Sequence, residues 1–521
     1  MKKQFLAVLL SASMCAGLLA GCGSSSEGQT EADTKTEAGT NEGGSETAED
    51  GEPVEVTVGV AQQFTTLDPG LSTETVNRYA IAHMYSGLYK KLEDGSVVPE
   101  LAAEEAEVSE DGLTYTVHLN NNMTFFNGDK LDAEDVAWSI NELIAKGYHD
   151  ADALAAVSKV EAKDADTAVI TLKTPNSNLL WTLTGRAGLV FDKDAKYDLK
   201  TQAVGSGPYT VAKFVENSSI TLKANEKYWG KNKAKTPTVV VKYLADDNAA
   251  VNALKSGDVQ VLAPITENLA EPFKSDSAKY TVKAGNGTDK FVLGFNNASG
   301  SKLADKRIRQ AIRYAINHKE LIASRGGADK ALGGPIPSLD PGYEDLTNLY
   351  PYDQNKAKSL MAEAGYSTDK PLQLTLTYAN IYGTELGDQL RSQLKPIGID
   401  LKVNVVEFST WLQDVYTNHT FDISLVDHNE SHDFASWTDP TYYFGYDNKN
   451  VTKLYNEGVA ATSDKERDAK FAAAAKLVSE DAPADWLFNY RITTATAKGV
   501  EGFPFDLNQT VLPLYNVTYT K

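Results

Sequence analysis

Hydrophobic and polar residues alternate along several short segments of the chain, which is the pattern of half-buried β-strands. In residues 113–119, Leu113, Tyr115, Val117 and Leu119 share one face, while threonine and histidine side chains share the other. Similar alternating or continuously apolar runs predict further strands at residues 54–60, 160–172, 238–244, 259–262, 291–297, 372–378 and 399–406.

Segments whose apolar residues repeat every three to four positions predict helices between these strands. They lie at residues 75–92, 132–143, 246–257, 305–318, 355–365, 387–394 and 464–478. The helix after Asp305 has the clearest apolar face. Four basic residues lie mostly off that face, where we expect them to be solvated: Arg307, Arg309, Arg313 and His318. Because strands and helices alternate, the predicted fold class is α/β.

The length and charge of the chain limit its architecture and partners. A chain of 521 residues is longer than one hydrophobic core usually supports, so two or three lobes are expected. The 71 acidic residues outnumber the 50 basic ones, which gives a formal net charge of -21. Nucleic acid is a poor partner for such a surface.

The first fifty residues have the composition of a secretion signal followed by a tether. Two lysines precede a mostly apolar run over residues 5–19, as in a signal peptide. The run ends in Leu-Ala-Gly-Cys22, which resembles the bacterial lipobox and implies that Cys22 carries lipid. An ordinary signal with a chance cysteine is the alternative. Residues 22–52 are rich in Gly, Ser, Thr, Ala and acidic residues, so we expect a disordered linker.

Catalytic and cofactor motifs are absent from the sequence. The only cysteines are Cys15 and Cys22, so the mature body has no disulfide, thiol nucleophile or cysteine-based metal site. Neither Gly-x-Ser-x-Gly nor His-Glu-x-x-His occurs. An enzyme is therefore the least favoured class of function, and no cofactor is expected.

Residues 113–143 combine a strand, an Asn-Gly turn and a helix that Asp132 can cap, with Asp135 three residues later. Phe-Asn-Gly-Asp at residues 126–129 and Ala-Glu-Asp-Val-Ala-Trp-Ser at 133–139 resemble the signature of the peptide-type (family 5) solute-binding proteins of ABC importers. Other strings in the same order resemble that family too, at residues 67–69, 98–102, 205–209, 225–230 and 305–312.

This resemblance implies a type II periplasmic-binding-protein-like fold, with two α/β lobes joined by a hinge and an extra domain inserted early. The expected division of the chain is a signal peptide at 1–21, a lipid-anchored linker at 22–52, a discontinuous lobe I at 53–74, 202–288 and 488–521, an inserted domain at 75–201 and lobe II at 289–487.

The resemblance also implies a function. We expect a monomeric lipoprotein that captures peptides or peptide-like solutes and delivers them to the permease and ATPase subunits of an ABC importer. It would be anchored by lipid alone at the outer face of the cytoplasmic membrane, with a Gram-positive cell surface favoured over a periplasm. Two alternatives stay open: a receptor for nickel, a metal chelate or another non-peptide solute, and, more remotely, a secreted hydrolase.

The stretch from residue 426 to 446 is dense in polar and aromatic side chains, which favours a ligand wall, although the aromatics can instead fill the core. In peptide-binding members an Asp in this region pairs with the peptide ammonium. The family string matches in two registers. One register places Asp427 at that position and the other places Ser436 there, which removes the anchor.

The sequence and the resemblance together give a set of candidate ligand contacts. The set comprises Gln63, Phe64, Trp181, Arg186, Asn296, Asn297, Asp427, Asn429, Ser436, Trp437, Tyr442 and Tyr443. Of these, Arg186 is expected to meet a ligand carboxylate. His428 and His432 are the alternative metal ligands, with two exposed loop histidines as the default interpretation.

Overall fold

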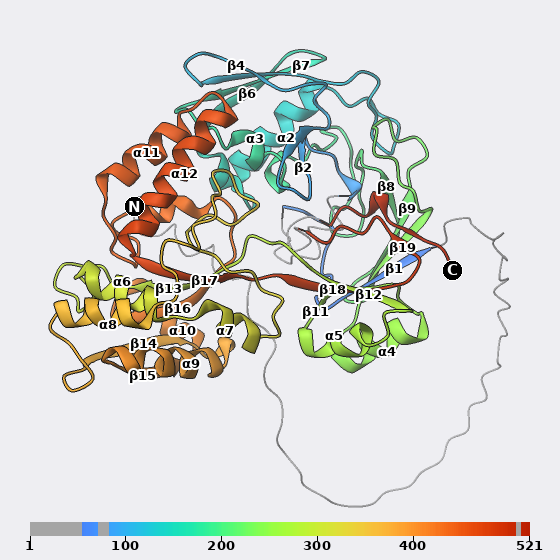
Figure 1. Cartoon of the computed structure of the whole chain (residues 1–521). Helices are drawn as coiled ribbons and strands as arrows, with labels where there is room; N and C mark the ends of the chain where they lie inside the picture. Colours follow the sequence, from blue (N-terminus) through green and yellow to red (C-terminus); the bar gives the residue numbers. More distant parts are fainter. Residues whose placement is uncertain (1–54, 71–82, 507–511) are drawn as a thin grey trace, which may run out of the picture.

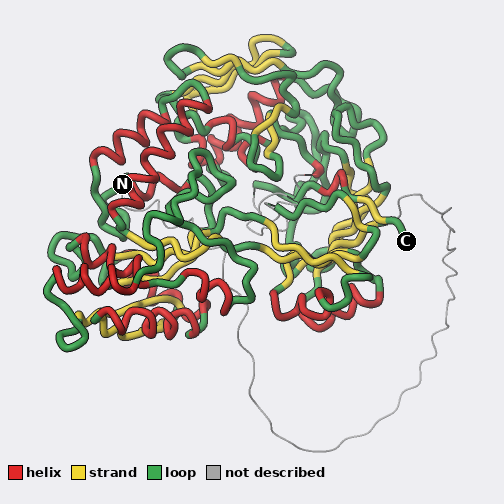
Figure 2. Tube along the Cα trace, in the orientation of Figure 1, coloured by secondary structure: helices red, strands yellow, loops and turns green. Residues whose placement is uncertain are grey.

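The computed structural model describes residues 55–70, 83–506 and 512–521, and three sheets organise it (Figures 1 and 2). We call the parts built on the largest sheet lobe I, on the second sheet lobe II, and on the third sheet the inserted domain. None of the helices in these ranges combines the length and apolar character that a membrane crossing requires.

Lobe I contains a seven-stranded sheet in the order β12–β18–β11–β1–β10–β9–β8. Its central strand β1 pairs in parallel with both β10 and β11, and α4 connects those two strands. The helices α4 and α5 lie together below the sheet in Figure 1. The bounds are β1 Val56–Val60, β8 Tyr209–Val215, β9 Ser219–Ala224, β10 Thr238–Tyr243, α4 Asp247–Ser256, β11 Val261–Ile265, α5 Glu267–Lys274, β12 Tyr280–Gly285 and β18 Ile492–Ala497.

Lobe II contains a five-stranded sheet in the order β15–β14–β16–β13–β17 with a hydrophobic core on each face. Helices α6 to α9 cover one face, and α10 to α12 cover the other. The strands are β13 Lys290–Phe295, β14 Leu372–Ala379, β15 Ile399–Val406, β16 Ile423–His428 and β17 Ala484–Asn489. The helices are α6 Lys306–Ala315, α7 His318–Ser324, α8 Gln354–Glu363, α9 Glu385–Leu394, α10 Phe408–Trp411, α11 Lys449–Val459 and α12 Asp464–Asp481.

The inserted domain contains a four-stranded sheet in the order β4–β5–β7–β6, against which α2 packs. The predicted cap of α2 is confirmed, because Asp132 accepts from the amide of Glu134 and Asp135 reaches back to the amide of Asp132. The bounds are β4 Glu107–Val108, β5 Thr114–His118, α2 Ala133–Lys146, β6 Val157–Asp164, β7 Thr167–Leu172 and α3 Leu179–Thr182. The small sheets pair β2 Tyr89–Lys91 with β3 Val97–Pro99, and β19 Val500–Glu501 with β20 Thr518–Tyr519.

The chain passes between the two large sheets twice. It leaves lobe I after β12 and enters lobe II at β13, and it returns from β17 to β18. In Figure 1, β17 and β18 run one after the other across the middle of the molecule. The returning strand β18 lies between β11 and β12 and pairs antiparallel with both.

Two local predictions are wrong. The helix predicted at residues 75–92 lies partly outside the described residues, and its last part is the strand β2, which pairs with β3. Two of the arginines expected to be solvated are buried instead: Arg313 is 2% exposed and Arg309 is 8% exposed. Arg309 donates to backbone carbonyls, and Arg313 pairs with the buried carboxylate of Asp485.

Candidate functional site

The two crossings between the lobes are tied to each other by hydrogen bonds. The side-chain amide of Asn489 donates to the carbonyls of Gly287, at 3.1 Å, and Asp289, at 2.7 Å. The amide of Tyr490 donates to the Asp289 carbonyl at 2.9 Å. Since β13 and β16 pair directly, the carboxyl end of β16 lies at this junction.

Asp427, near the end of β16, brings a carboxyl group to the junction. Its Oδ1 atom is buried and has no hydrogen-bond partner among the described residues. Burial raises the pKa of this carboxyl well above its usual value, and the nearby Asp289 raises it further, although Lys290 and Arg325 oppose the rise. The backbone amide of Asp427 donates to the hydroxyl of Tyr382 at 3.1 Å, which fixes the strand end. A positive group on a ligand would therefore find an unsatisfied acceptor here.

Arg325 adds a cation surrounded by aromatic rings to the same junction. Its Nε lies 2.7 Å from a carboxylate oxygen of Asp329. Its guanidinium lies 5.1 Å from the ring centroid of Phe291, 4.6 Å from that of Phe488 and 5.9 Å from that of Tyr490. These contacts hold the guanidinium in place from both crossings.

Lys290 holds the turn that follows β16. The side chain is only 2% exposed. Its Nζ donates to the carbonyls of Thr288, at 3.1 Å, and Glu430, at 2.6 Å, and lies 3.2 Å from Oδ1 of Asp433. A buried ammonium needs such partners, so the turn backbone and the lysine stabilise each other.

His428 and His432, the alternative metal ligands, have separate environments. His428 Nε2 lies 3.1 Å from the Tyr443 hydroxyl, and its Nδ1 lies 3.6 Å from a carboxylate oxygen of Asp433. His432 Nδ1 lies 3.5 Å from a carboxylate oxygen of Asp340. Across the part of the chain that the structure describes, no group of three or more His, Cys, Asp or Glu residues is arranged to hold a metal ion.

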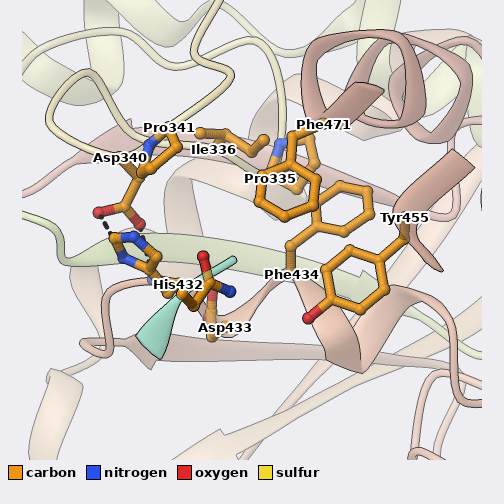
Figure 3. Close-up of a pocket in the computed structure, with 10 residues that line it drawn as sticks. Pro335, Ile336, Asp340, Pro341, His432, Asp433, Phe434, Tyr455 and Phe471 are labelled. Atoms are coloured by element: carbon orange, nitrogen blue, oxygen red, sulfur yellow. Dashed lines mark hydrogen bonds and ion pairs between the residues drawn. The ribbon is translucent and has the colours of Figure 1, made fainter. Parts of the chain in front are cut away.

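A hollow beside His432 lies between the inserted domain and lobe II (Figure 3). Its volume is about 20 Å³, roughly room for one water molecule, so it cannot take a peptide. Figure 3 shows aromatic rings on one side and the contact between Asp340 and His432 on the other. The lining residues are Asn178, Pro335, Ile336, Asp340, Pro341, His432, Asp433, Phe434, Tyr455 and Phe471.

The candidate aromatics after β16 pack in the core of lobe II. Trp437 stacks on Phe444 with ring centroids 4.4 Å apart and planes 9° apart. Tyr443 is buried, and the half-buried Tyr442 packs against it with centroids 5.0 Å apart. Their rings thus pack against one another, in agreement with the interpretation that the aromatics of this stretch fill the core.

The two registers of the family string meet different surroundings. Ser436 lies in the short helix Asp433–Trp437, and its hydroxyl donates to the Asp433 carbonyl at 2.9 Å. Asn429 is exposed, and its carbonyl accepts from the Thr288 hydroxyl at 3.4 Å. Of the two anchor positions, Asp427 alone supplies a carboxylate oxygen without a partner in the described chain.

The remaining candidates are dispersed. Gln63 is exposed after β1, whereas Phe64 is fully buried in the lobe I core. Arg186, expected to meet a ligand carboxylate, instead pairs with Asp150 at 3.0 Å and donates to the Pro69 carbonyl at 3.1 Å. This difference arises because the fold itself supplies acceptors for Arg186, one from the inserted domain and one from the turn after β1.

Asn296 and Asn297 fasten the end of β13. The side-chain amide of Asn296 donates to the carbonyls of His419 and Phe421. That of Asn297 donates to the carbonyls of Phe295, Phe444 and Pro483. Their side chains hold the loops around β13. Cys22 and the linker at 22–52 lie outside the described residues.

Sequence reasoning missed most of the charged junction: Asp289, Lys290, Arg325, Asp329 and Tyr490. One signal was present, because Lys290 begins an otherwise apolar strand and follows an aspartate. A charged pair at the start of a buried strand requires partners and so indicates a polar site. The other residues have no local signal, because they meet only through the two crossings.

Comparison with known proteins identifies the class of the chain. A family model described as bacterial extracellular solute-binding proteins, family 5 Middle, matches residues 96–451, more than half of the chain. The chain belongs to this family. Family 5 proteins are non-catalytic, so this solute-binding protein of an ABC importer acts outside the cytoplasm and performs no reaction.

Relatives and solved structures agree with this family. The glutathione-binding protein GsiB of Escherichia coli O1:K1 / APEC is 26% identical to this family 5 protein over 473 residues, which cover 86% of this chain and 91% of the relative. The unliganded open form of the murein tripeptide binding protein MppA has a TM-score of 0.81 at 21% identity, covering 91% of this chain and 98% of that one. AppA from Bacillus subtilis with a nonapeptide has a TM-score of 0.65 at 21% identity, covering 90% and 100%. The predicted periplasmic-binding-protein fold is thereby confirmed.

Proposed function

We propose that this protein captures peptides or peptide-like solutes by their ammonium group at Asp427 and delivers them to the permease of an ABC importer. The observation that carries the proposal is the Asp427 carboxyl at the junction of the lobes, with a buried oxygen that lacks a partner among the described residues. A buried carboxylate is the natural acceptor for an ammonium group, because each neutralises the other and supplies hydrogen bonds.

Closure of the two lobes would couple capture to delivery. Lobes I and II are joined by the crossings from β12 to β13 and from β17 to β18, which can act as a two-stranded hinge. A ligand that contacts both lobes favours the closed form by its difference in affinity for the two states. The names of several relatives support a peptide-like ligand: GsiB is a glutathione-binding protein and MppA a murein tripeptide binding protein.

The test compares free peptides with their N-acetylated counterparts in thermal melting of the mature chain. Free tripeptides are expected to raise the melting midpoint by mass action, and acetylated ones are expected to leave it unchanged. Asp427→Asn should abolish the rise, whereas Asp439→Asn, a change at an exposed carboxylate nearby, should keep it. Equal shifts with free and acetylated peptides would rule out the ammonium anchor.

A metal or metal-chelate ligand is the outcome that would replace this proposal. The same melting assay with nickel, alone and with chelators, covers it. A shift that needs nickel and is lost in His428→Ala and His432→Ala would assign the chain a metal ligand instead of a peptide.

We also propose that Cys22 carries lipid and that residues 22–52 hold the body away from the membrane surface. The sequence Leu-Ala-Gly-Cys at residues 19–22 supports this. Cys22→Ser should release the protein from cells into the medium and abolish palmitate labelling. Retention of the variant at the cell surface would contradict the anchor.

A further inference from the structure

A second hollow lies on lobe I, and it is larger and mostly apolar. Its volume is about 150 Å³, the size of engineered apolar cavities that hold benzene. Side chains from α4, α5 and β11 form its walls, and Tyr490 from the returning crossing closes one side. The residues that give the hollow its apolar lining are Leu244, Val251, Leu262, Ile265, Leu269 and Tyr490.

The hollow lies where the topology of the lobe I sheet favours a ligand. The strands β1, β10 and β11 are parallel, and the chain passes from one side of β1 to the other between β10 and β11. Ligands of such sheets bind outside the carboxyl ends of the strands at this switch point. The hollow is lined by Val60 and Ile265, the last residues of β1 and β11, and by Leu244, which follows β10.

Gly59 shapes the floor of the hollow. A β-carbon at this position would come within 2.7 Å of Leu262 Cδ2 and 2.8 Å of Leu244 Cδ1. The glycine therefore lets two leucine side chains approach each other across β1. Half-buried apolar groups from Val251 and Leu269 complete a surface that gains from being covered.

Tyr490 joins this hollow to the charged junction. Its ring lines the hollow and also lies 5.9 Å from the Arg325 guanidinium. Burial raises the pKa of Tyr490, and the charges of Asp329, Asp289 and Asp427 add to the rise, although Arg325 opposes it. The same side chain thus borders the apolar surface and lies within the field of the proposed ammonium anchor.

We propose that this hollow binds an aliphatic or phenyl side chain at the first or second residue of the ligand, next to its ammonium group. The inference rests on the proposed function and adds the side-chain chemistry of the ligand. Asp247 and Thr266 also line the hollow, but most of its lining is apolar. An acidic side chain would have to leave water and lie near the Asp247 carboxylate, so acidic ligands are disfavoured.

The test measures the affinity of the mature chain by calorimetry for Leu-Gly-Gly, Gly-Leu-Gly, Gly-Gly-Leu and Gly-Gly-Gly. Leucine in the first or second position is expected to strengthen binding by about tenfold or more over triglycine, and leucine in the third position much less. Leu269→Lys should remove this preference while retaining triglycine binding, and its neighbour Asn268→Lys, an exposed position on α5, should retain it.

The outcomes separate the two proposals. Equal affinities for the three leucine peptides, unchanged in Leu269→Lys, would overturn the apolar pocket and leave the peptide function standing. Failure of all the peptides to bind would overturn the peptide function and this inference with it. Circular dichroism of each variant shows whether it is folded. Gly59→Ala fills the floor of the hollow and supplies a second test of the apolar pocket that adds no charge.

Discussion

Trp181 of the inserted domain stacks on His432 of lobe II, with ring centroids 3.9 Å apart and planes 24° apart. Close by, the amide and hydroxyl of Ser177 donate to the last carbonyls of α11, those of Val459 and Gly458, both at 2.9 Å. Trp181 was a candidate ligand contact, and its indole here joins two parts of the fold. The inserted domain is therefore fastened to the lobe that also carries Asp427.

Removing this indole should loosen the inserted domain. Trp181→Ala is expected to lower the free energy of unfolding by about 1–3 kcal/mol, since it removes a stacked pair and half-buried apolar area. Trp138→Ala is the control, because that indole is 40% exposed on α2. Denaturant unfolding measures both, and an equal loss in the two variants would contradict the role of the stack.

The pH dependence of ligand binding should report the Asp427 carboxyl. Burial and then Asp289 raise its pKa above the usual value of 3.8. An ammonium ligand needs the ionised form, so affinity should fall as the pH drops through this raised pKa, by up to about tenfold per pH unit. Calorimetry across that range measures the slope. The Asp427→Asn variant should bind the ligand weakly, and its affinity should not depend on pH in this range. An unchanged slope in the variant would assign the titration to another group.

The same carboxyl should cost stability in the absence of ligand. Its raised pKa means that the folded state holds the proton more tightly than the unfolded state does. The protonated carboxyl therefore stabilises the fold below pH 3.8, and this stabilisation is lost as the pH rises through the folded pKa. Asp427→Asn is therefore expected to raise the unfolding free energy at neutral pH by about 1–3 kcal/mol. Thermal melting without ligand measures this, and a lower midpoint in the variant would contradict it.

Two arginines on α6 should differ sharply in their effect on stability. Arg313 is buried and lies 3.2 Å from Asp485, whereas Arg307 is an exposed partner of Asp305. Arg313→Met leaves a buried carboxylate whose remaining side-chain partner is His318, and should cost about 3–5 kcal/mol. Arg307→Met should cost less than about 1 kcal/mol. Denaturant unfolding of the two variants tests this contrast.

Asp340 should contribute to unfolding at low pH. Burial alone would raise its pKa, but His432, with help from Lys290 and Ser431, lowers it from 3.8 to about 2. The stabilisation is therefore present above pH 3.8 and lost as the pH falls from there to about 2, amounting to roughly 2 kcal/mol. Asp340→Asn should remove this part of the pH dependence, and Asp369→Asn, an exposed control, should keep it.

Local patterns predicted much of the fold because they are set by neighbouring residues. The strand and capped helix around Asp132 depend on period and turn chemistry alone, and they are confirmed. Arg313 shows the limit. The helical period places it off the apolar face, but its partner Asp485 lies 172 residues later, so only the folded chain explains its burial.

The candidate site likewise contains residues that the sequence predicted and residues that only the fold brings together. Asp427 was named from a family string, but Asp289, Arg325 and Tyr490 come from segments that meet only where the chain crosses between the lobes. The aromatic stretch after β16 had two interpretations, and composition alone does not distinguish a ligand wall from a core that happens to be rich in tyrosine.

The position of β18 between β11 and β12 has a consequence for biogenesis. While residues 492–497 are still being synthesised or exported, β12 has no neighbouring strand and β11 has one open edge. Any product truncated within lobe II would expose these edges to pairing with other chains. Residues 492–497 thus act as a test of chain integrity, because only a chain that extends through β18 covers the edges of β11 and β12 that would otherwise favour aggregation or proteolysis.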